Sequence, residues 1–140
     1  MVGSEIRDWL HSMDIYDYDI CDGVVHVVGD VYIGGKWFAI IPVQFGYVSG
    51  NFYCINSQLA SLEGCPSEVG GSFDCSHNNL KSLEGCPSEV GGFFDCRHNY
   101  LESLEGCPSE VGGDFNCVGN MMNSEPDTTG IKIGGKFLWN

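Results

Sequence analysis

The 140-residue chain is poor in positive charge. It has 6 lysines and arginines against 19 aspartates and glutamates, so its formal net charge is −13. Proteins that bind nucleic acid directly, or that bind an anionic membrane surface, present basic patches. The composition therefore argues against both kinds of partner and leaves basic protein surfaces as candidate targets.

Long apolar runs and catalytic motifs are also missing. No stretch has the length or composition of a transmembrane helix, and the first residues, MVGSEIRDWL, contain no signal-peptide core, so we expect a cytoplasmic protein. The chain has no Gly-x-Ser-x-Gly sequence, no phosphate-binding loop and no metal-binding pair of histidines. We therefore predict a protein that is not an enzyme and that needs no cofactor and no metal.

What the chain does have is repetition. Residues 61–123 hold three nearly identical 21-residue units: SLEGCPSEVGGSFDCSHNNLK, SLEGCPSEVGGFFDCRHNYLE and SLEGCPSEVGGDFNCVGNMMN. A unit this short cannot bury a core on its own, so successive units must stack into a solenoid. Stepping back from Val69 by 21 residues finds weaker copies at Val48 and Val27. Five coils are therefore readable over residues 27–122.

Each part of a coil has a predicted role. Phe73-x-Cys75 alternates as a short strand with both side chains in the core, and equivalent strands should lie parallel at about 4.8 Å. The Gly70-Gly71 pair before the strand permits a tight turn. The amide of Asn78, where the strand ends, can bond backbone groups that the turn leaves open. Gly85-Cys86-Pro87 then predicts an extended outer arc.

The two ends differ from the repeats. Ser4 is placed to cap a helix over residues 5–13, and Asp22-Gly23 predicts a hairpin between segments 15–20 and 24–28. Near the other end, segment 130–137 echoes segment 30–37. It arrives 16 residues after the preceding strand instead of 21, which predicts a shortened last coil. Four apolar residues should cover that coil: Ile131, Ile133, Phe137 and Leu138.

The predicted fold is a mainly-β repeat solenoid of about six coils with one parallel sheet. It forms a single domain over residues 1–140. Residues 1–26 form a helix-and-hairpin cap, residues 27–122 the coils and residues 123–140 a C-terminal strand cap.

Seven of the eight cysteines follow the repeat period in two series: Cys54, Cys75, Cys96 and Cys117; and Cys65, Cys86 and Cys107. There is no Cys-x-x-Cys pair, and the Cys-x-His spacing after Cys75 and Cys96 is not that of a zinc finger. We interpret both series as reduced thiols inside the core. A metal site and disulfides are the weaker alternatives.

A group of aspartates near the N-terminus, Asp14, Asp17, Asp19 and Asp22, is a second candidate for holding calcium or magnesium. Strand alternation places Asp17 and Asp19 on a solvated face, and the spacing matches no calcium loop. We therefore favour a solvated surface.

The spacing Phe73-x-Cys75-x-x-Asn78-x-Leu80-x-x-Leu83 resembles the leucine-rich-repeat signature. The outer arc from Leu83 to Val90 is similar to the short arc of bacterial effector leucine-rich repeats. The sequence motif SLEGCPSEVGGxFxC resembles leucine-rich-repeat proteins of tailed bacteriophages more closely still. This resemblance covers residues 27–122 and implies a viral origin. It departs from the family pattern at Ser57, which replaces asparagine, and at Met122, which replaces leucine.

The outward strand positions differ among coils whose other residues are invariant. Aromatic and arginine side chains at such positions are typical anchors of protein interfaces, and solenoids bind partners on a concave sheet. Neutral drift is the alternative. The candidate partner-binding residues are Tyr53, Ile55, Ser72, Asp74, Ser76, Phe93, Asp95, Arg97, Asp114, Asn116 and Val118, beside Asn51.

We therefore expect a protein–protein interaction module with an unidentified protein partner. The bacteriophage resemblance implies an accessory protein that binds, and could inhibit, a host protein in the host cytoplasm. Two alternatives stay open. Two columns of glutamates could imitate nucleic-acid phosphates and make the chain an acidic decoy; they are Glu63, Glu84 and Glu105, and Glu68, Glu89 and Glu110. The chain could also be a structural or assembly module of the virion. The oligomeric state is open.

Overall fold

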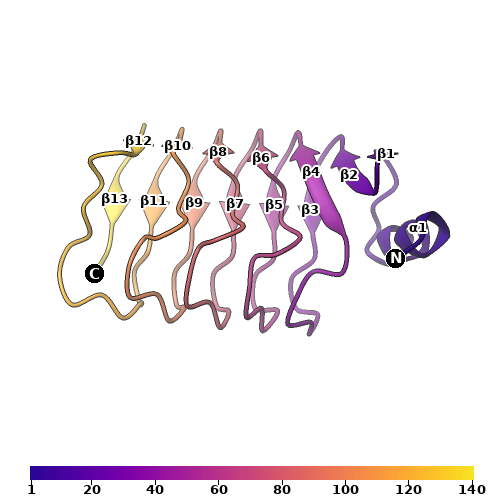
Figure 1. Cartoon of the computed structure of the whole chain (residues 1–140). Helices are drawn as coiled ribbons and strands as arrows, with labels where there is room; N and C mark the ends of the chain where they lie inside the picture. The colour runs from indigo at the N-terminus through magenta and orange to yellow at the C-terminus, as the bar shows by residue number, and fades with distance from the viewer.

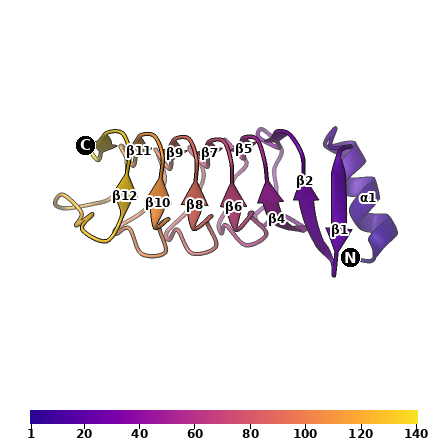
Figure 2. The same ribbon diagram turned by 90° about the horizontal axis from the view of Figure 1, so that it is seen from above.

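The structure, a computed structural model of residues 1–140, is a mainly-β solenoid of about five turns (Figure 1). Each turn adds one short strand to each of two sheets that run along the molecule. The strands of each sheet follow one another in a straight row, and the chain termini lie toward opposite ends (Figures 1 and 2).

The sheets have seven and six strands, and we call them sheet A and sheet B. Sheet A consists of β1 (Tyr18–Cys21), β2 (Val24–Val27), β4 (Gln44–Val48), β6 (Glu68–Val69), β8 (Glu89–Val90), β10 (Glu110–Val111) and β12 (Lys132–Ile133). Sheet B consists of β3 (Val31–Tyr32), β5 (Phe52–Tyr53), β7 (Phe73–Asp74), β9 (Phe94–Asp95), β11 (Phe115–Asn116) and β13 (Phe137–Leu138). Neighbouring strands are parallel except for the antiparallel pair β1–β2.

The register of the strands confirms the 21-residue period. Val48, Val69, Val90 and Val111 are successive partners in sheet A, and Val27 pairs with Val48. The expectation of one parallel sheet was wrong. The residues that follow the proline of each arc, expected to be a plain extended arc, pair with their neighbours and form sheet A. Each of the arc strands β6, β8 and β10 has only two residues, which is too short to show an alternation of apolar and polar residues in the sequence.

The inner side of sheet B carries a stack of phenylalanine rings. Phe52 and Phe73 lie 5.7 Å apart between ring centroids and Phe73 and Phe94 lie 5.5 Å apart, with both pairs nearly parallel. The stack continues through Phe115 to Phe137. Leucines of the outer arc close the core from the other side, where Leu59, Leu62, Leu80, Leu83 and Leu101 are fully buried. Identical side chains one strand spacing apart thus build one continuous core.

Three asparagines bind the coils together as predicted. Asn99 is buried; its Oδ1 accepts the N–H of Leu80 in the preceding coil, and its Nδ2 donates to the carbonyls of Cys75, Cys96 and Arg97. Asn78 and Asn120 make the equivalent bonds. These amides satisfy backbone groups that would otherwise be buried without partners. In the coil where serine replaces asparagine, the Ser57 hydroxyl donates weakly to the carbonyls of Ile33 and Ile55, each at 3.3 Å.

The N-terminal cap is a helix and a hairpin, as expected. Helix α1 (Gly3–Ser12) buries Ile6 and Leu10 against the first coil and lies beside β1 (Figure 2). The expected cap residue was wrong, because Val2 occupies the N-cap position and no side chain caps the helix. Asp22 and Gly23 form the hairpin turn with positive φ angles of 51° and 77°.

The C-terminal end differs from the sequence expectation. β13 follows β11 by a full turn, with Phe115 paired to Phe137, so the last coil is not shortened. Gly134 and Gly135 occupy the same place as Gly112 and Gly113, at the corner where the chain passes from sheet A to sheet B. The earlier pair, Gly34 and Gly35, lies after β3 of sheet B, so the two similar segments are not equivalent in the fold. Ile131, Ile133 and Phe137 pack on the core as expected, but Leu138 points outward from sheet B and is exposed.

The cysteines of the first series are fully buried, and burial raises the pKa of Cys75 and Cys96 well above the ordinary value. In the second series Cys65 is buried, whereas Cys86 and Cys107 are only half-buried. The interpretation of two internal columns therefore holds fully for the first series alone. No helix reaches the length and apolar character that crossing a membrane requires.

Replacing Asn99 by alanine should destabilise the fold by about 2–3 kcal/mol, because the N–H of Leu80 and three carbonyls lose their partner. Urea unfolding of the purified protein measures this. The matched control is Asn79→Ala, at an exposed asparagine that makes no side-chain hydrogen bond, which should change stability by less than about 0.5 kcal/mol. Equal losses in both variants would contradict the structural role of the asparagine column.

Candidate binding face

The outer side of sheet B presents three residues from each coil, and we call this surface the sheet B face. Strand pairing puts equivalent residues side by side along the solenoid. The first column is Asp30, Asn51, Ser72, Phe93, Asp114 and Lys136. The middle column is Tyr32, Tyr53, Asp74, Asp95, Asn116 and Leu138, and the third is Gly34, Ile55, Ser76, Arg97, Val118 and Asn140. All predicted binding residues therefore lie on one face, as expected, although the row of strands is straight in Figures 1 and 2 rather than visibly concave.

Four predicted residues of this face are not exposed. Ser72, Asp74, Ser76 and Asp95 have exposed fractions of 9%, 7%, 2% and 6%. Larger neighbours account for part of this burial. Tyr53, from the coil before Asp74, and Phe93, from the coil after it, meet with ring centroids 6.0 Å apart, so their contact crosses the coil that carries Ser72 and Asp74. Asp95 is bonded by the Arg97 guanidinium. The sequence pattern correctly gave the direction of these residues but not the covering by taller neighbours.

Side chains of the first column join neighbouring coils by hydrogen bonds. Side-chain oxygens of Asp30, Asn51 and Ser72 each accept the backbone N–H of the next coil, at 2.7, 2.8 and 3.0 Å. Asp114 accepts the N–H of Lys136 in the same way at 2.8 Å. Ser72 and Asp114 therefore have a role in joining coils that explains them without a partner.

Phe93 breaks this rule. It stands in the same column but has no acceptor, and the N–H of Asp114 in the next coil makes no hydrogen bond. The ring is instead exposed and leans toward Tyr53. At position 93 the fold loses a hydrogen bond that the other coils make and gains an exposed aromatic ring. A departure of this kind from the local structural pattern is expected at a functional position.

In three coils the side chain of the middle column also makes a structural hydrogen bond, within its own coil. The carboxylates of Asp74 and Asp95 and the amide oxygen of Asn116 each accept the N–H two residues later, at 2.9–3.1 Å. These bonds close the turn at the strand end. Because Asn116 does the same work as the two aspartates, the turn does not require a negative charge.

The remaining residues of the face form an exposed apolar strip. Tyr32, Tyr53 and Phe93 make a continuous aromatic ridge, with ring centroids 5.1 and 6.0 Å apart. A depression of about 220 Å³ continues from Phe93 to Leu138. Sequence reasoning missed Tyr32 and Leu138. Alternation between Val31 and Ile33 signalled the first, and the wrong register of the last coil hid the second.

Of the other exposed aromatic residues, Tyr16 stacks on His11 in the N-terminal cap with ring centroids 5.1 Å apart, and the rest stand alone. Trp37, Tyr47 and Tyr100 are well exposed and make no ring contact with another aromatic side chain. Single exposed apolar residues are ordinary on soluble proteins, whereas a contiguous patch marks a binding surface. The aromatic ridge is therefore the feature of the surface that most needs a function.

The charges of the face are unevenly balanced. Arg97 contacts Asp95 through both Nε and Nη2 at 3.0 Å, and this bonding raises the pKa of the guanidinium. Asp74 has Ser76 where Asp95 has Arg97. Burial raises the pKa of the Asp74 carboxyl above its ordinary value, and the hydrogen bonds from Ser76 only partly oppose this effect.

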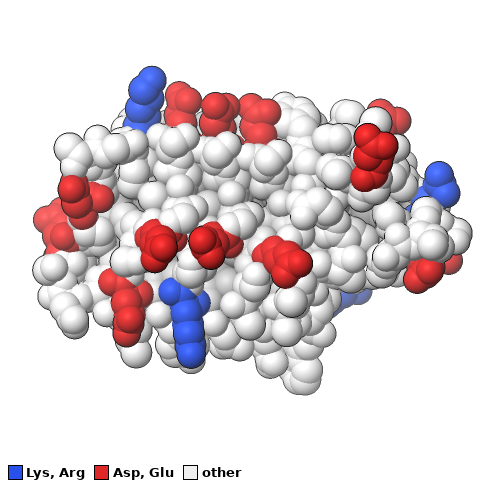
Figure 3. All heavy atoms as spheres, in the orientation of Figure 1, with Lys and Arg blue, Asp and Glu red and all other residues white.

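The glutamates form rows on other surfaces. Glu68, Glu89 and Glu110 are direct partners in sheet A and are all exposed. The row continues to Lys132 at one end and to Tyr47 at the other. Figure 3 shows acidic groups following one another along the solenoid in this way. The step between neighbouring strands, about 4.8 Å, exceeds the 3.4 Å step between phosphates of one DNA strand.

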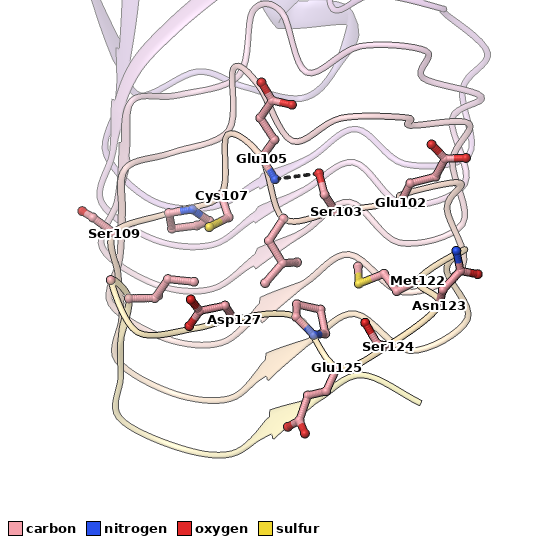
Figure 4. A pocket seen from close by; sticks show the side chains of 15 residues that line it. Glu102, Ser103, Glu105, Cys107, Ser109, Met122, Asn123, Ser124, Glu125 and Asp127 are labelled. Carbon is pink, nitrogen blue, oxygen red and sulfur yellow. Dashed lines mark hydrogen bonds between the residues drawn. The ribbon is translucent and has the colours of Figure 1, made fainter.

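The largest cavity, about 830 Å³, lies between the last regular outer arc, residues 102–109, and the loop 122–131 (Figure 4). Its carboxylates do not converge, because Glu102, Glu105 and Glu125 point away from the hollow. No group of three or more potential metal ligands occurs anywhere in the chain. The cavity therefore has the shape of a site but not the chemistry of a metal centre. The expected solvated positions of Asp17 and Asp19 are confirmed.

His77 and His98 lie where the strands of sheet B end. Their rings stack with centroids 4.6 Å apart, and both residues have left-handed φ angles, 58° and 53°. Gly119 occupies the next place in this column, where a Cβ would lie 2.4 Å from the His98 ring. The pair is exposed and borders the sheet B face.

Comparisons with protein-family models, with curated proteins and with solved structures found no match for this chain. The candidate site therefore rests on the geometry of the face itself.

Replacing Asp74 by asparagine should leave the fold at least as stable as the parent at pH 7, because the amide oxygen keeps the bond from the Ser76 N–H and the buried charge is removed. A raised folded-state pKa means that the parent regains this stability as the carboxyl protonates. The difference between the two proteins should therefore shrink as the pH falls through that pKa.

Urea unfolding at several pH values measures this difference. Asp74→Ala, which also loses the acceptor, should be less stable than Asp74→Asn by about 1 kcal/mol. The control Asp19→Asn, at an exposed aspartate, should differ from the parent in stability at pH 7 by less than about 0.5 kcal/mol. An Asp74→Asn protein clearly less stable than the parent at pH 7 would contradict the assignment of an uncompensated charge.

Proposed function

We propose that this chain is a protein–protein interaction module that binds its partner through the sheet B face. The observation that carries the proposal is Phe93, which is exposed at a position where the other coils place a hydrogen-bond acceptor. Its ring extends a ridge formed with Tyr32 and Tyr53. Exposed aromatic residues that lie together, with an arginine beside them, are the residue types that anchor protein interfaces.

The binding surface that this proposal defines is narrower and longer than the predicted set. Its contact residues are Tyr32, Tyr53, Ile55, Phe93, Arg97, Val118 and Leu138. Ser72, Asp74, Ser76, Asp95, Asp114 and Asn116 support it from beneath or at its edge through the hydrogen bonds described above. The resemblance to bacteriophage leucine-rich-repeat proteins supports a partner in a bacterial host cell, with inhibition of that partner as the consequence.

An acidic decoy is the second candidate, and the in-register glutamates of sheet A favour it. Their spacing departs from that of nucleic-acid phosphates, and the row ends at a lysine. We therefore place it behind the sheet B face. A structural module of the virion has no specific observation in its favour.

The test is affinity capture from bacterial lysate with the parent and a Phe93→Ser/Arg97→Ser variant. These substitutions copy the third coil, which has Ser72 and Ser76 at the same positions, onto the fourth. The new serine at 93 can accept the N–H of Asp114 as Ser72 accepts that of Phe93, which offsets part of the cost of leaving the Asp95 carboxylate without Arg97. Circular dichroism of the purified variant establishes that it is folded before it is used.

We expect a protein that the parent retains and the variant loses by about tenfold or more, as for the loss of anchor residues worth at least 1.4 kcal/mol. The control is Glu68→Gln/Glu89→Gln/Glu110→Gln on sheet A, which should retain it. A partner held equally by parent and serine variant would contradict the proposal. A partner lost only from the glutamine variant would favour the acidic decoy.

A further inference from the structure

The three regular coils, which are the third, fourth and fifth and carry Ser72, Phe93 and Asp114 in the first column, differ in the charge of the middle column. In the fourth coil Asp95 is neutralised by Arg97, and in the fifth the pair is the uncharged Asn116 and Val118. The third coil has Asp74 beside Ser76 and has no base of its own. Asp74 is thus the one buried acidic position of the column without an ion-pair partner from its own coil.

Nothing in the fold requires that charge. Asn116 closes the same turn with an uncharged amide, so asparagine at position 74 would satisfy the N–H of Ser76 equally well. A desolvated carboxylate costs stability unless a cation pairs with it. A charge kept where the local structure gains nothing from it is a sign of function.

The side chains beside Asp74 are of the kinds that receive a planar cation. Tyr53 and Phe93 meet across the coil that carries Asp74, with ring centroids 6.0 Å apart and planes inclined at 32°, so the two rings must separate before a cation can stack between them. The pKa of Tyr53 is raised, first by burial and then by its neighbours Tyr32, Asp74 and Asp30, of which the two aspartates are negatively charged. Arg97 faces Asp74 from the fourth coil, but Asp95 holds its guanidinium.

We infer that the partner inserts an arginine side chain between Tyr53 and Phe93 onto Asp74, reproducing in the third coil the ion pair that Asp95 and Arg97 make in the fourth. A guanidinium stacks on aromatic rings and bonds a carboxylate with two donors, which a lysine ammonium cannot do together. Tyr53 and Phe93, which meet across the coil of Asp74, are themselves partly exposed, so rotamer changes on binding uncover Asp74. This inference rests on the proposed function and names the chemistry of its partner.

The test uses two probe peptides, acetyl-Ala-Arg-Ala-amide and the same peptide with citrulline, which has nearly the shape of arginine but no charge. NMR titration of the labelled full chain should show saturable shifts at Tyr53, Asp74, Ser76 and Phe93 with the arginine peptide. The citrulline peptide should give none. Asp74→Asn should weaken binding of the arginine peptide by about fivefold or more.

Asp19→Asn is the matched control, because it removes one negative charge at an exposed position away from the sheet B face and leaves Asp74 and the Asp95–Arg97 pair in place. This control should bind the arginine peptide as tightly as the parent does. Equal affinity of the parent and Asp74→Asn, equal binding of both peptides, or shifts centred on the glutamates of sheet A would overturn the inference.

The Asp74→Asn variant also separates this inference from the proposed function. A captured partner that is lost with Phe93→Ser/Arg97→Ser but kept at full strength by Asp74→Asn would leave the sheet B face as the interface and overturn only the arginine. A partner kept by both variants would overturn the proposed function as well.

Discussion

The whole structure depends on one constraint: each coil must place its backbone against the previous coil at a single strand spacing. In a solenoid there is no other core to compensate for a coil that is displaced, because each coil contacts only its neighbours. The asparagine column, the stacked phenylalanines and the glycine pairs all serve this constraint. At Gly91, for example, a Cβ would lie 2.1 Å from the carbonyl oxygen of Gly70, so the corner between the sheets admits no side chain.

That constraint also separates structural residues from free ones on the sheet B face. A side chain that accepts a backbone N–H, such as Asn51, Ser72 or Asp114, is explained by the stacking of coils. Phe93 makes no such bond and is not buried, and Tyr32 and Tyr53 extend the ridge that it begins. The candidate binding surface is therefore defined by subtraction, as the set of outward residues that make no bond between coils.

Much of the fold could be predicted because the repeat fixes it. The period placed Val27, Val48 and Val69 in register, and the spacing of Asn78 predicted its bonds to open backbone groups. The part of sheet A that the outer arcs form, β6, β8 and β10, could not be predicted, because each of these strands has only two residues and shows no alternation. The last coil was misread because two segments of similar sequence, Val31 to Gly35 and Ile131 to Gly135, lie in different sheets, and only the stacking shows which corner the glycines occupy.

The candidate site was predicted in position but not in detail. Alternation alone told which residues of β5, β7, β9 and β11 point outward, and the structure puts all of them on one face. Alternation carries no information about contacts between coils. It could not show that Tyr53 and Phe93 meet over Asp74, nor that Ser72 and Asp114 are hydrogen-bond acceptors for the next coil.

The central claim, that partners contact the sheet B face, is tested most directly by site-specific photo-crosslinking. Phe93 and Tyr47 are a matched pair, since they are aromatic, 36% and 42% exposed, and lie in sheet B's face and in sheet A respectively. Each is replaced in turn by p-benzoylphenylalanine, and the protein is irradiated in bacterial lysate. The account predicts a covalent adduct with a protein from position 93 and none from position 47. An adduct from position 47 alone, equal adducts from both positions, or none from either would contradict it.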